Sequence, residues 1–257
     1  MTRKRARDGR KDDDPEGVSK SRPAREVDIE KAFALGRYPI TRQEFGAFVR
    51  DTHRAVEKGC HVMKHGVWIL DQSKDWKHPG FQQSPRDPVI CVSWNDAQDY
   101  VQWLNSKVRG FAQDGALAGP YRLPGWEEIE YAAGGGTKSP YYWGARAQRT
   151  RANYGAERCL PCRPTRKGAD RWLYTSPVGK FPPNPFGLYD MAGNVWQWAR
   201  TCQSDSKAIP PKVCPSQALH GGSWLTNPEY MRTGNYSSAD VRHRNYEIGF
   251  RLARTLN

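Results

Sequence analysis

Three stretches of the chain place apolar residues at helical spacing behind a helix start signal. The first begins at the capping box Thr41–Glu44 and continues with apolar residues on one face. The second begins at Ser93 and repeats apolar residues at i, i+3, i+4 and i+7 from Ala97. The third begins near Pro124 and stops at the glycines of residues 134–136. The pattern predicts three helices.

The remaining apolar runs are short. They predict strands within residues 25–40, 88–94 and 249–254, and a hairpin that turns at His65-Gly66. Residues 136–222 are dense in Gly, Pro and Asn. They show neither the helical spacing nor the strand alternation of apolar residues, so they are predicted to form loops. A loop region of that length inside one domain needs metal ions, disulfides or a function to fix it.

Composition agrees with a loop-rich globule that has an aromatic core. The 257 residues include 10 Trp, 12 Tyr and 8 Phe, and they suffice for one sizeable domain. No apolar run approaches the ~18 residues of a membrane helix, so no membrane association is expected. Residues 1–25 mix basic and acidic side chains without the apolar segment of a signal peptide. We predict a disordered tail over residues 1–25 and one domain over residues 26–257.

The formal net charge is +13, which raises the possibility of an acidic partner. Residues 138–180, which are predicted to form a loop, contain ten Lys or Arg and two acidic residues, so their net charge is +8. Nucleic-acid binders place such charge on a helix or beside base-stacking aromatic residues, so nucleic acid is not expected. A solvated basic loop is favoured, and an acidic partner docking on it remains the alternative.

Six cysteines fall into three neighbouring pairs in loop contexts. They are Cys60 and Cys91, Cys159 and Cys162, and Cys202 and Cys214. An even number so placed suggests disulfides and an oxidising compartment, although no signal peptide is visible. Cys159 and Cys162 alternatively form a redox or metal half-site, for which one CxxC is a weak signal.

Seven phrases in fixed order carry a family resemblance. They are "ALGRYPITRQEFGAFV", "PVICVSWNDAQDYVQWLN", "YRLPGWEEIEYAAGGG", "YYWG", "SPVGKFPPNPFGLYDMAGNVWQW", "HGGSW" and "IGFRLAR". Together they resemble the formylglycine-generating enzyme family, also called the sulfatase-modifying factor family, over residues 26–257. The resemblance implies an α+β domain of C-type-lectin-like type, with little regular structure, a small twisted sheet, two to three helices and long ordered loops.

The family's catalytic cysteines are missing from this sequence. Formylglycine-generating enzymes carry two cysteines two and seven residues past the aromatic residue of the Gly-Gly-Ser motif, where they bind copper(I) and use O2 to oxidise a substrate cysteine. Counted from Trp224, these positions hold Thr226 and Met231. A hydroxyl and a thioether cannot supply paired thiolates, so formylglycine generation and copper binding are not expected.

The resemblance also implies two calcium sites. The first set of ligands is Asn153, Tyr154, Asp170 and Trp172, with carbonyl oxygens from the two aromatic residues. The second set is Asp190, Gly193, Val195 and Gln197, where the family commonly has Asn first and Glu last. Side-chain and carbonyl oxygens mixed on loops are what Ca²⁺ prefers. Ions at these sites would also explain how the long basic loop is held in place.

The C-terminal residues 224–247 are rich in the Tyr and Asn that adaptable binding faces use. Their layout resembles the variable region of retroelement-diversified C-type-lectin proteins. The candidate ligand-binding residues are Trp224, Thr226, Asn227, Glu229, Tyr230, Asn235, Tyr236, His243, Asn245 and Tyr246. Trp224 itself is expected to pack beneath the surface, whereas the Tyr, Asn and His positions are expected to be exposed.

These observations leave three functional hypotheses. The first is a non-catalytic, calcium-stabilised module that presents the 224–247 surface to a protein or other ligand. A retroelement-diversified variable protein would be one example of such a module. The second is a metal-dependent oxidoreductase of the same family, with its centre at Cys159 and Cys162 or at a histidine. The third is an accessory protein whose basic loop docks on an acidic partner.

Overall fold

The computed structural model describes residues 4–5, 20–21, 26–108, 121–156, 171–202 and 214–256. Its helices are α1 (Arg42–Thr52), α2 (Trp94–Val108), α3 (Trp126–Gly134) and the 3-10 helix η1 (Pro228–Met231). Its strands are β1 (Lys4–Arg5), β2 (Lys20–Ser21), β3 (Glu26–Val27), β4 (Phe33–Leu35), β5 (Cys60–Lys64), β6 (Val67–Asp71), β7 (Tyr121–Arg122), β8 (Trp196–Cys202), β9 (Ser216–His220), β10 (Asn235–Asp240), β11 (Ile248–Gly249) and β12 (Ala253–Thr255).

The three predicted helices are present, and their ends have the predicted causes. At α1 the Thr41 amide donates to Glu44 Oε2 at 2.7 Å, and the Glu44 amide donates back to Thr41 Oγ1. Ser93 and Asp96 make the same reciprocal pair at the start of α2. α3 ends where Gly135 adopts a positive φ of 56°, which glycine tolerates without strain.

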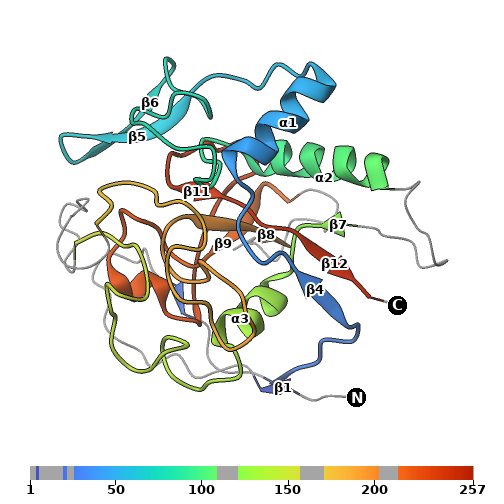
Figure 1. The fold of residues 1–257 in the computed structure, drawn as a ribbon, viewed down its shortest axis with the longest axis vertical. Coiled ribbons are helices and arrows are strands. Elements are labelled where there is room, and N and C mark those ends of the chain that lie inside the picture. Colours follow the sequence, from blue (N-terminus) through green and yellow to red (C-terminus); the bar gives the residue numbers. More distant parts are fainter. Residues whose placement is uncertain are drawn as a thin grey trace.

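A five-stranded sheet in the order β11-β8-β9-β10-β2 forms the centre of the domain (Figure 1). Side chains of successive strand residues point to opposite faces. On β8, Trp198 joins the core on the face of α1 and α2, and Ala199 joins the core on the face of α3. On β9, Leu219 joins the core on the face of α1 and α2, and Ala218 joins the core on the face of α3. The sheet is therefore buried on both faces.

Aromatic residues fill the core between the sheet and the two longer helices, which lie side by side (Figure 1). Phe45 of α1 stacks on Tyr100 of α2 at 6.1 Å between ring centroids, and Tyr100 meets Phe250 edge-on at 5.4 Å. On the other face, Trp126 of α3 meets Tyr236 of β10 at 5.0 Å. A three-stranded sheet, β4-β12-β7, joins the start of the domain to its end.

Two predictions about strands are wrong. Residues 88–94 are not a strand, since only Pro88 bridges, to Thr41, before α2 begins. Conversely, β8 and β9 lie within residues 136–222, which were predicted to be loop. Both faces are buried in residues 196–199 of β8 and 217–220 of β9, so neighbours such as Trp198 and Ala199, or Ala218 and Leu219, are both apolar and interrupt the alternation that predicts a strand.

The predicted hairpin and two of the cysteine pairs are confirmed. β5 and β6 pair antiparallel across a turn in which His65 and Gly66 have positive φ. A disulfide between Cys60 and Cys91 ties the hairpin to the domain, and a second joins Cys202 to Cys214. These bonds are compatible with an oxidising compartment. The third pair, Cys159 and Cys162, lies outside the described residues.

The N-terminal segment contributes two described strand pairs. β1 pairs with β3, and β2 pairs with the start of β10. The other residues up to 25 lie outside the described part, so the boundary between tail and domain stays a prediction. None of the helices in the described part combines the length and apolar character that a membrane span requires.

Candidate functional site

The loop after β9 carries the positions that hold the copper-binding cysteines in formylglycine-generating enzymes. Gly221 and Gly222 open it with φ of 101° and 69°. A Cβ added to Gly222 would lie 2.9 Å from Met231 Cγ, so this turn needs a residue without a side chain. The turn brings Thr226 close to Ser223, whose amide donates to Thr226 Oγ1 at 2.8 Å.

Both replaced positions are buried within this structure. Thr226 is 8% exposed and its hydroxyl donates to the Ser223 carbonyl at 3.2 Å. Met231 is 2% exposed, and its thioether packs against the backbone near Gly193 and Gly222. The two side chains therefore serve packing and hydrogen bonding and present no thiolate.

A buried carboxyl group lies beside this loop. Glu247 is 7% exposed, and Ser223 Oγ donates a short hydrogen bond to its Oε2. No ion pair to Glu247 is found among the described residues. Burial raises the pKa of Glu247 to about 7, while the hydrogen bond from Ser223 acts in the opposite direction. No sequence motif indicated this pair, because the two residues are 24 positions apart.

An aromatic cluster includes the chain neighbours of this pair, since Trp224 follows Ser223 and Tyr246 precedes Glu247. Phe81 stacks on Tyr174 with ring centroids 4.1 Å apart, and Trp224 meets Tyr246 at 4.9 Å. The Trp224 indole donates to the Tyr246 carbonyl at 3.3 Å. Trp224 thus packs beneath the surface as expected.

The expectation of an exposed Tyr and Asn face is wrong for most of its members. Six of the ten candidate ligand-binding residues are buried: Trp224, Thr226, Asn235, Tyr236, Asn245 and Tyr246. The other four are exposed or half-buried: Asn227, Glu229, Tyr230 and His243. Asn235 and Tyr236 are buried because β10 lies inside the central sheet, where Tyr236 pairs with His220 and packs on Trp126. Trp224 and Tyr246 are buried in the cluster that packs against the β5–β6 hairpin.

Part of the first calcium ligand set fits a cation. Asn153 is 1% exposed, and its Oδ1 is buried without a hydrogen-bond donor, whereas its Nδ2 donates to the Tyr174 carbonyl at 2.7 Å. Such an orphan oxygen is unusual in a folded protein and suits a hard ion. The Tyr154 carbonyl accepts from Arg149 Nη1 at 2.9 Å, and Trp172 packs on Phe181. Asp170 lies outside the described residues.

The second set is brought together, but protein donors already occupy its side-chain oxygens. Gln197 Nε2 donates to the Asp190 carbonyl at 2.8 Å, and Gln197 Oε1 accepts from the Arg251 guanidinium. The Asp190 carboxylate accepts from the Gly179 amide and from Asn194. The Gly193 carbonyl accepts from the Val195 amide at 2.9 Å. This arrangement fits a cation less well than the first set does, and the buried Arg251 provides the positive charge locally.

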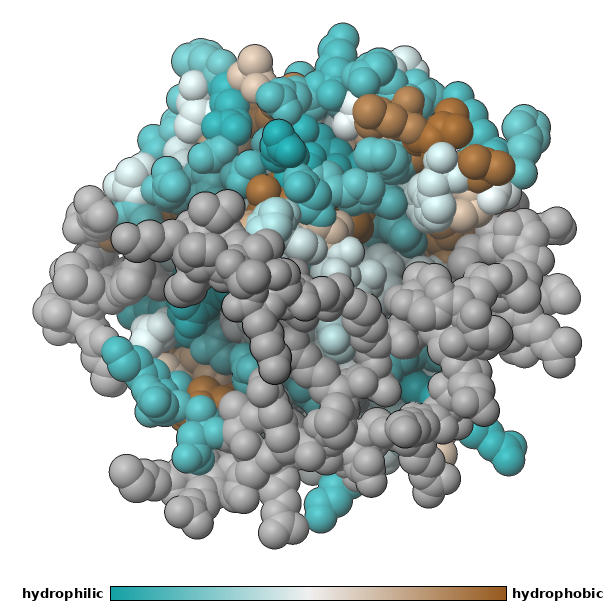
Figure 2. Space-filling view, turned by 180° about the vertical axis from the view of Figure 1, so that it is seen from behind, coloured by the Kyte–Doolittle hydropathy of each residue, from teal (hydrophilic) through white to brown (hydrophobic). Residues whose placement is uncertain are grey.

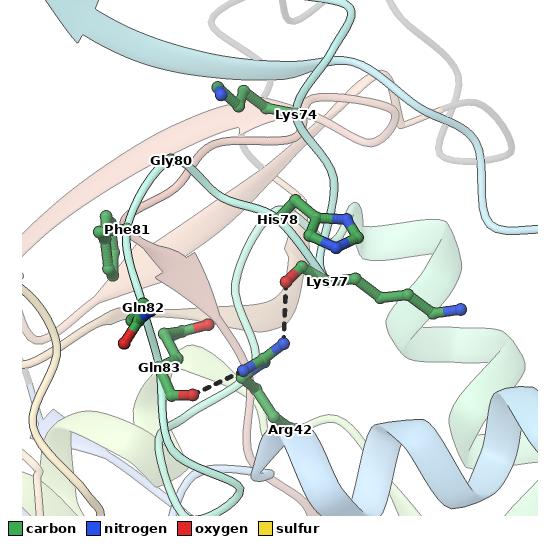
Figure 3. A pocket seen from close by; sticks show the side chains of 8 residues that line it. All are labelled: Arg42, Lys74, Lys77, His78, Gly80, Phe81, Gln82 and Gln83. Atoms are coloured by element: carbon green, nitrogen blue, oxygen red, sulfur yellow. Dashed lines mark hydrogen bonds between the residues drawn. The ribbon is translucent and has the colours of Figure 1, made fainter.

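An open pocket of about 450 Å³ lies next to the aromatic cluster (Figure 3). Its lining residues are Arg42, Lys74, Lys77, His78, Gly80, Phe81, Gln82 and Gln83. Arg42 at the start of α1 fixes the loop, because its guanidinium donates to the carbonyls of Gln83 and Lys77 at 2.8 and 2.9 Å. The lining contains basic side chains and no carboxylate. No sequence pattern indicated this pocket, because its residues come from a helix start and from a loop more than thirty positions away.

The basic loop of residues 138–180 is only partly described, since residues 157–170 lie outside. Within the described part, Lys138 and Arg146 are exposed, as a solvated loop requires. Arg149 instead stacks over the Tyr154 ring at 4.1 Å and donates to the Gly155 carbonyl. The described residues contain no group of three or more His, Cys, Asp or Glu side chains placed to hold one metal ion.

The fold and the Gly-Gly-Ser loop define a class: a C-type-lectin-like domain of mixed α+β structure, built as in formylglycine-generating enzymes. A family model, the sulfatase-modifying factor enzyme 1-like domain, matches residues 4–256. The chain therefore belongs to the sulfatase-modifying factor family.

Relatives and solved structures agree with this assignment. The chain is 32% identical to the inactive Cα-formylglycine-generating enzyme 2 of Bos taurus, over 83% of this chain and 72% of that protein. It is similar to PvdO from Pseudomonas aeruginosa, with 31% identity, a TM-score of 0.70 and coverage of 91% and 84% of the two chains. Treponema denticola variable protein 1 shares the fold at 22% identity, with a TM-score of 0.64 and coverage of 91% and 88%.

Proposed function

We propose that the chain is a non-catalytic, calcium-stabilised binding module of the sulfatase-modifying factor family. The observation that carries the proposal is the burial of Thr226 and Met231 where the enzymes place copper-binding cysteines. Similarity to a relative named as inactive supports the same interpretation. We assign the ligand surface to the accessible part of residues 224–247, which comprises the exposed Glu229 and the half-buried Asn227, Tyr230 and His243.

A retroelement-diversified variable protein is a narrower form of this proposal. Its support is the layout of residues 224–247, and the likeness to the Treponema protein concerns the fold alone. The alternative from the sequence is a metal-dependent oxidoreductase with its centre at Cys159 and Cys162, which lie outside the described part, or at a histidine. Protein purified without chelators and analysed by elemental mass spectrometry separates the two functions.

The proposal predicts that the protein neither binds copper(I) stoichiometrically nor converts a cysteine peptide to formylglycine. The reason is that a hydroxyl and a thioether replace the thiolates that this chemistry needs. The double variant Thr226→Cys, Met231→Cys is the matched comparison, and it is expected to bind about one copper(I) when supplied anaerobically. Stoichiometric copper or iron in the unmodified protein, or turnover of the peptide, would refute the non-catalytic function.

Calcium is predicted to raise the thermal stability through the orphan oxygen of Asn153. At free calcium about a hundredfold above Kd, the stabilisation is about 3 kcal/mol, or about 5–10 °C in Tm for a chain of this size. Asn153→Leu removes the oxygen and is expected to lose the response, whereas Asn153→Asp keeps an oxygen and is expected to retain it. Scanning calorimetry with chelator, calcium or magnesium measures the effect. Equal Tm values in all three conditions contradict the proposed site.

A further inference from the structure

Strand β6 exposes four large apolar residues in succession. Val67, Trp68, Ile69 and Leu70 are 62%, 41%, 36% and 50% exposed. Elsewhere in the described chain, only Phe186 and Leu256 are large apolar residues with comparable exposure, and each stands alone. The patch is visible as brown surface in the upper part of Figure 2, where the β5–β6 hairpin lies. Contiguous apolar surface on a soluble domain typically marks a binding site.

The outer edge of β6 is open to another strand. β6 pairs only with β5, and no described backbone segment bonds to its other edge. Edge strands are usually protected by Lys, Pro or a covering segment, and residues 67–70 contain none of the protective residue types. This edge can therefore accept an added strand.

The hairpin is held in place on its opposite side. The His61 amide on β5 donates to the Arg244 carbonyl at 2.8 Å, and the Tyr246 amide donates to the His61 carbonyl at 3.1 Å. The Cys60–Cys91 disulfide adds a covalent tie. A strand added at β6 thus meets a preorganised template, which lowers the entropic cost of binding.

The basic pocket lies beside the exposed strand β6. Trp68 and Phe81 both contact the Tyr246 ring, at 5.7 and 6.2 Å between centroids. Lys74 and Lys77 on the pocket wall form no ion pair among the described residues. The neighbouring carboxylate, Asp75, accepts from the Lys77 and His78 amides at 2.9 and 2.7 Å and lies 3.4 Å from His78 Nδ1. With Arg42 included, the pocket region keeps an excess of positive charge.

We propose that β6 and the basic pocket form a docking site for an extended acidic segment of a partner protein. The segment adds as a strand to β6, its apolar side chains cover Val67–Leu70, and its carboxylates reach Lys74 and Lys77. Charge selects this occupant over a second copy of the chain, because a second copy brings another net charge of +13 and the same basic pocket. The site uses other residues than the proposed 224–247 surface, which adjoins the hairpin where His243 stacks on His61 at 4.3 Å between ring centroids. It requires neither calcium nor the absence of catalysis.

The test uses the full protein and two labelled peptides in fluorescence anisotropy, one alternating valine with glutamate and one alternating valine with lysine. The glutamate peptide is expected to bind, more weakly as salt increases, and the lysine peptide is not. Lys74→Glu with Lys77→Glu, and Trp68→Ser with Leu70→Ser, are each expected to weaken binding by about tenfold or more. Lys138→Glu and Leu256→Ser make the same chemical changes elsewhere and are expected to leave the affinity unchanged.

Two further measurements keep the proposal falsifiable. Hydrogen exchange is expected to slow at the β6 amides when the glutamate peptide binds, because strand addition gives these amides hydrogen-bond acceptors. Sedimentation measures self-association, and a dimer that Leu70→Ser abolishes would assign the patch to a second copy and overturn the proposal. Equal binding of both peptides, or full affinity in either double variant, would overturn it as well. Circular dichroism confirms that each variant is folded.

Discussion

Replacing Arg251 with methionine is expected to lower the free energy of unfolding by about 3–5 kcal/mol. Arg251 is fully buried, and its guanidinium donates to Gln197 Oε1, to the Gly36 carbonyl at 2.9 Å and to the Tyr189 carbonyl at 2.7 Å. Methionine fills much of the volume but leaves these acceptors unsatisfied. It also removes the charge that faces the buried Asp190, whose pKa burial raises.

Arg251→Lys is the matched control. It keeps the charge, but an ammonium group on a flexible stem cannot reproduce the planar fork that reaches separate acceptors. We expect the free energy of unfolding of this variant to lie between the values of the methionine variant and the wild type. Urea denaturation under non-reducing conditions measures both, so that the disulfides stay intact. A loss below about 1 kcal/mol in the methionine variant would show that the network does not hold the fold together.

The second large effect concerns the pH dependence of stability at Glu247. Its pKa is about 7 in the folded protein, against an ordinary value of 4.5. Between these two values the folded state binds more protons than the unfolded state, so the stability that this group contributes is lost as pH rises through the window. The difference between the two pKa values corresponds to about 3 kcal/mol.

Glu247→Gln is expected to remove this component, because the amide resembles the protonated acid and does not ionise. The variant should gain about 3 kcal/mol relative to wild type between pH 4 and pH 8. Glu229→Gln, at a side chain that is 60% exposed, serves as the control and is expected to show no such gain. The measurement is denaturant unfolding across that pH range. Contributions from His220 and His243, whose pKa burial lowers to about 4, are common to all three proteins and cancel.

The helices and the hairpin were predictable because their causes are local, whereas the two disulfides, which join cysteines 31 and 12 positions apart, were predicted from the even number and order of the cysteines. Thr41 and Glu44 are three residues apart, and so are Ser93 and Asp96, so each cap can be recognised within one turn of sequence. The turn at His65-Gly66 depends on two adjacent residues. The family resemblance likewise rested on short phrases in order, and it gave the fold class.

The candidate sites were less predictable because they depend on long-range packing. Tyr236 and Tyr246 have the residue type of a binding face, but they are buried by β10 and by the β5–β6 hairpin. Gln197 has the position of a calcium ligand, yet its oxygen accepts from a guanidinium 54 residues away. Nothing in the local sequence distinguishes these outcomes.

The sequence by itself determined the helix starts, the end of the third helix, the hairpin turn and the replacement of the family's two cysteines, since each follows from residues close together in the chain. The tertiary structure decided which strands form the central sheet and which polar groups are buried. β8 and β9 lie at the centre of the sheet, with helices on both faces, and Glu247 acquires a raised pKa because the fold buries its carboxyl group. Burial depends on contacts between distant segments, and the order of residues along the chain does not contain it locally.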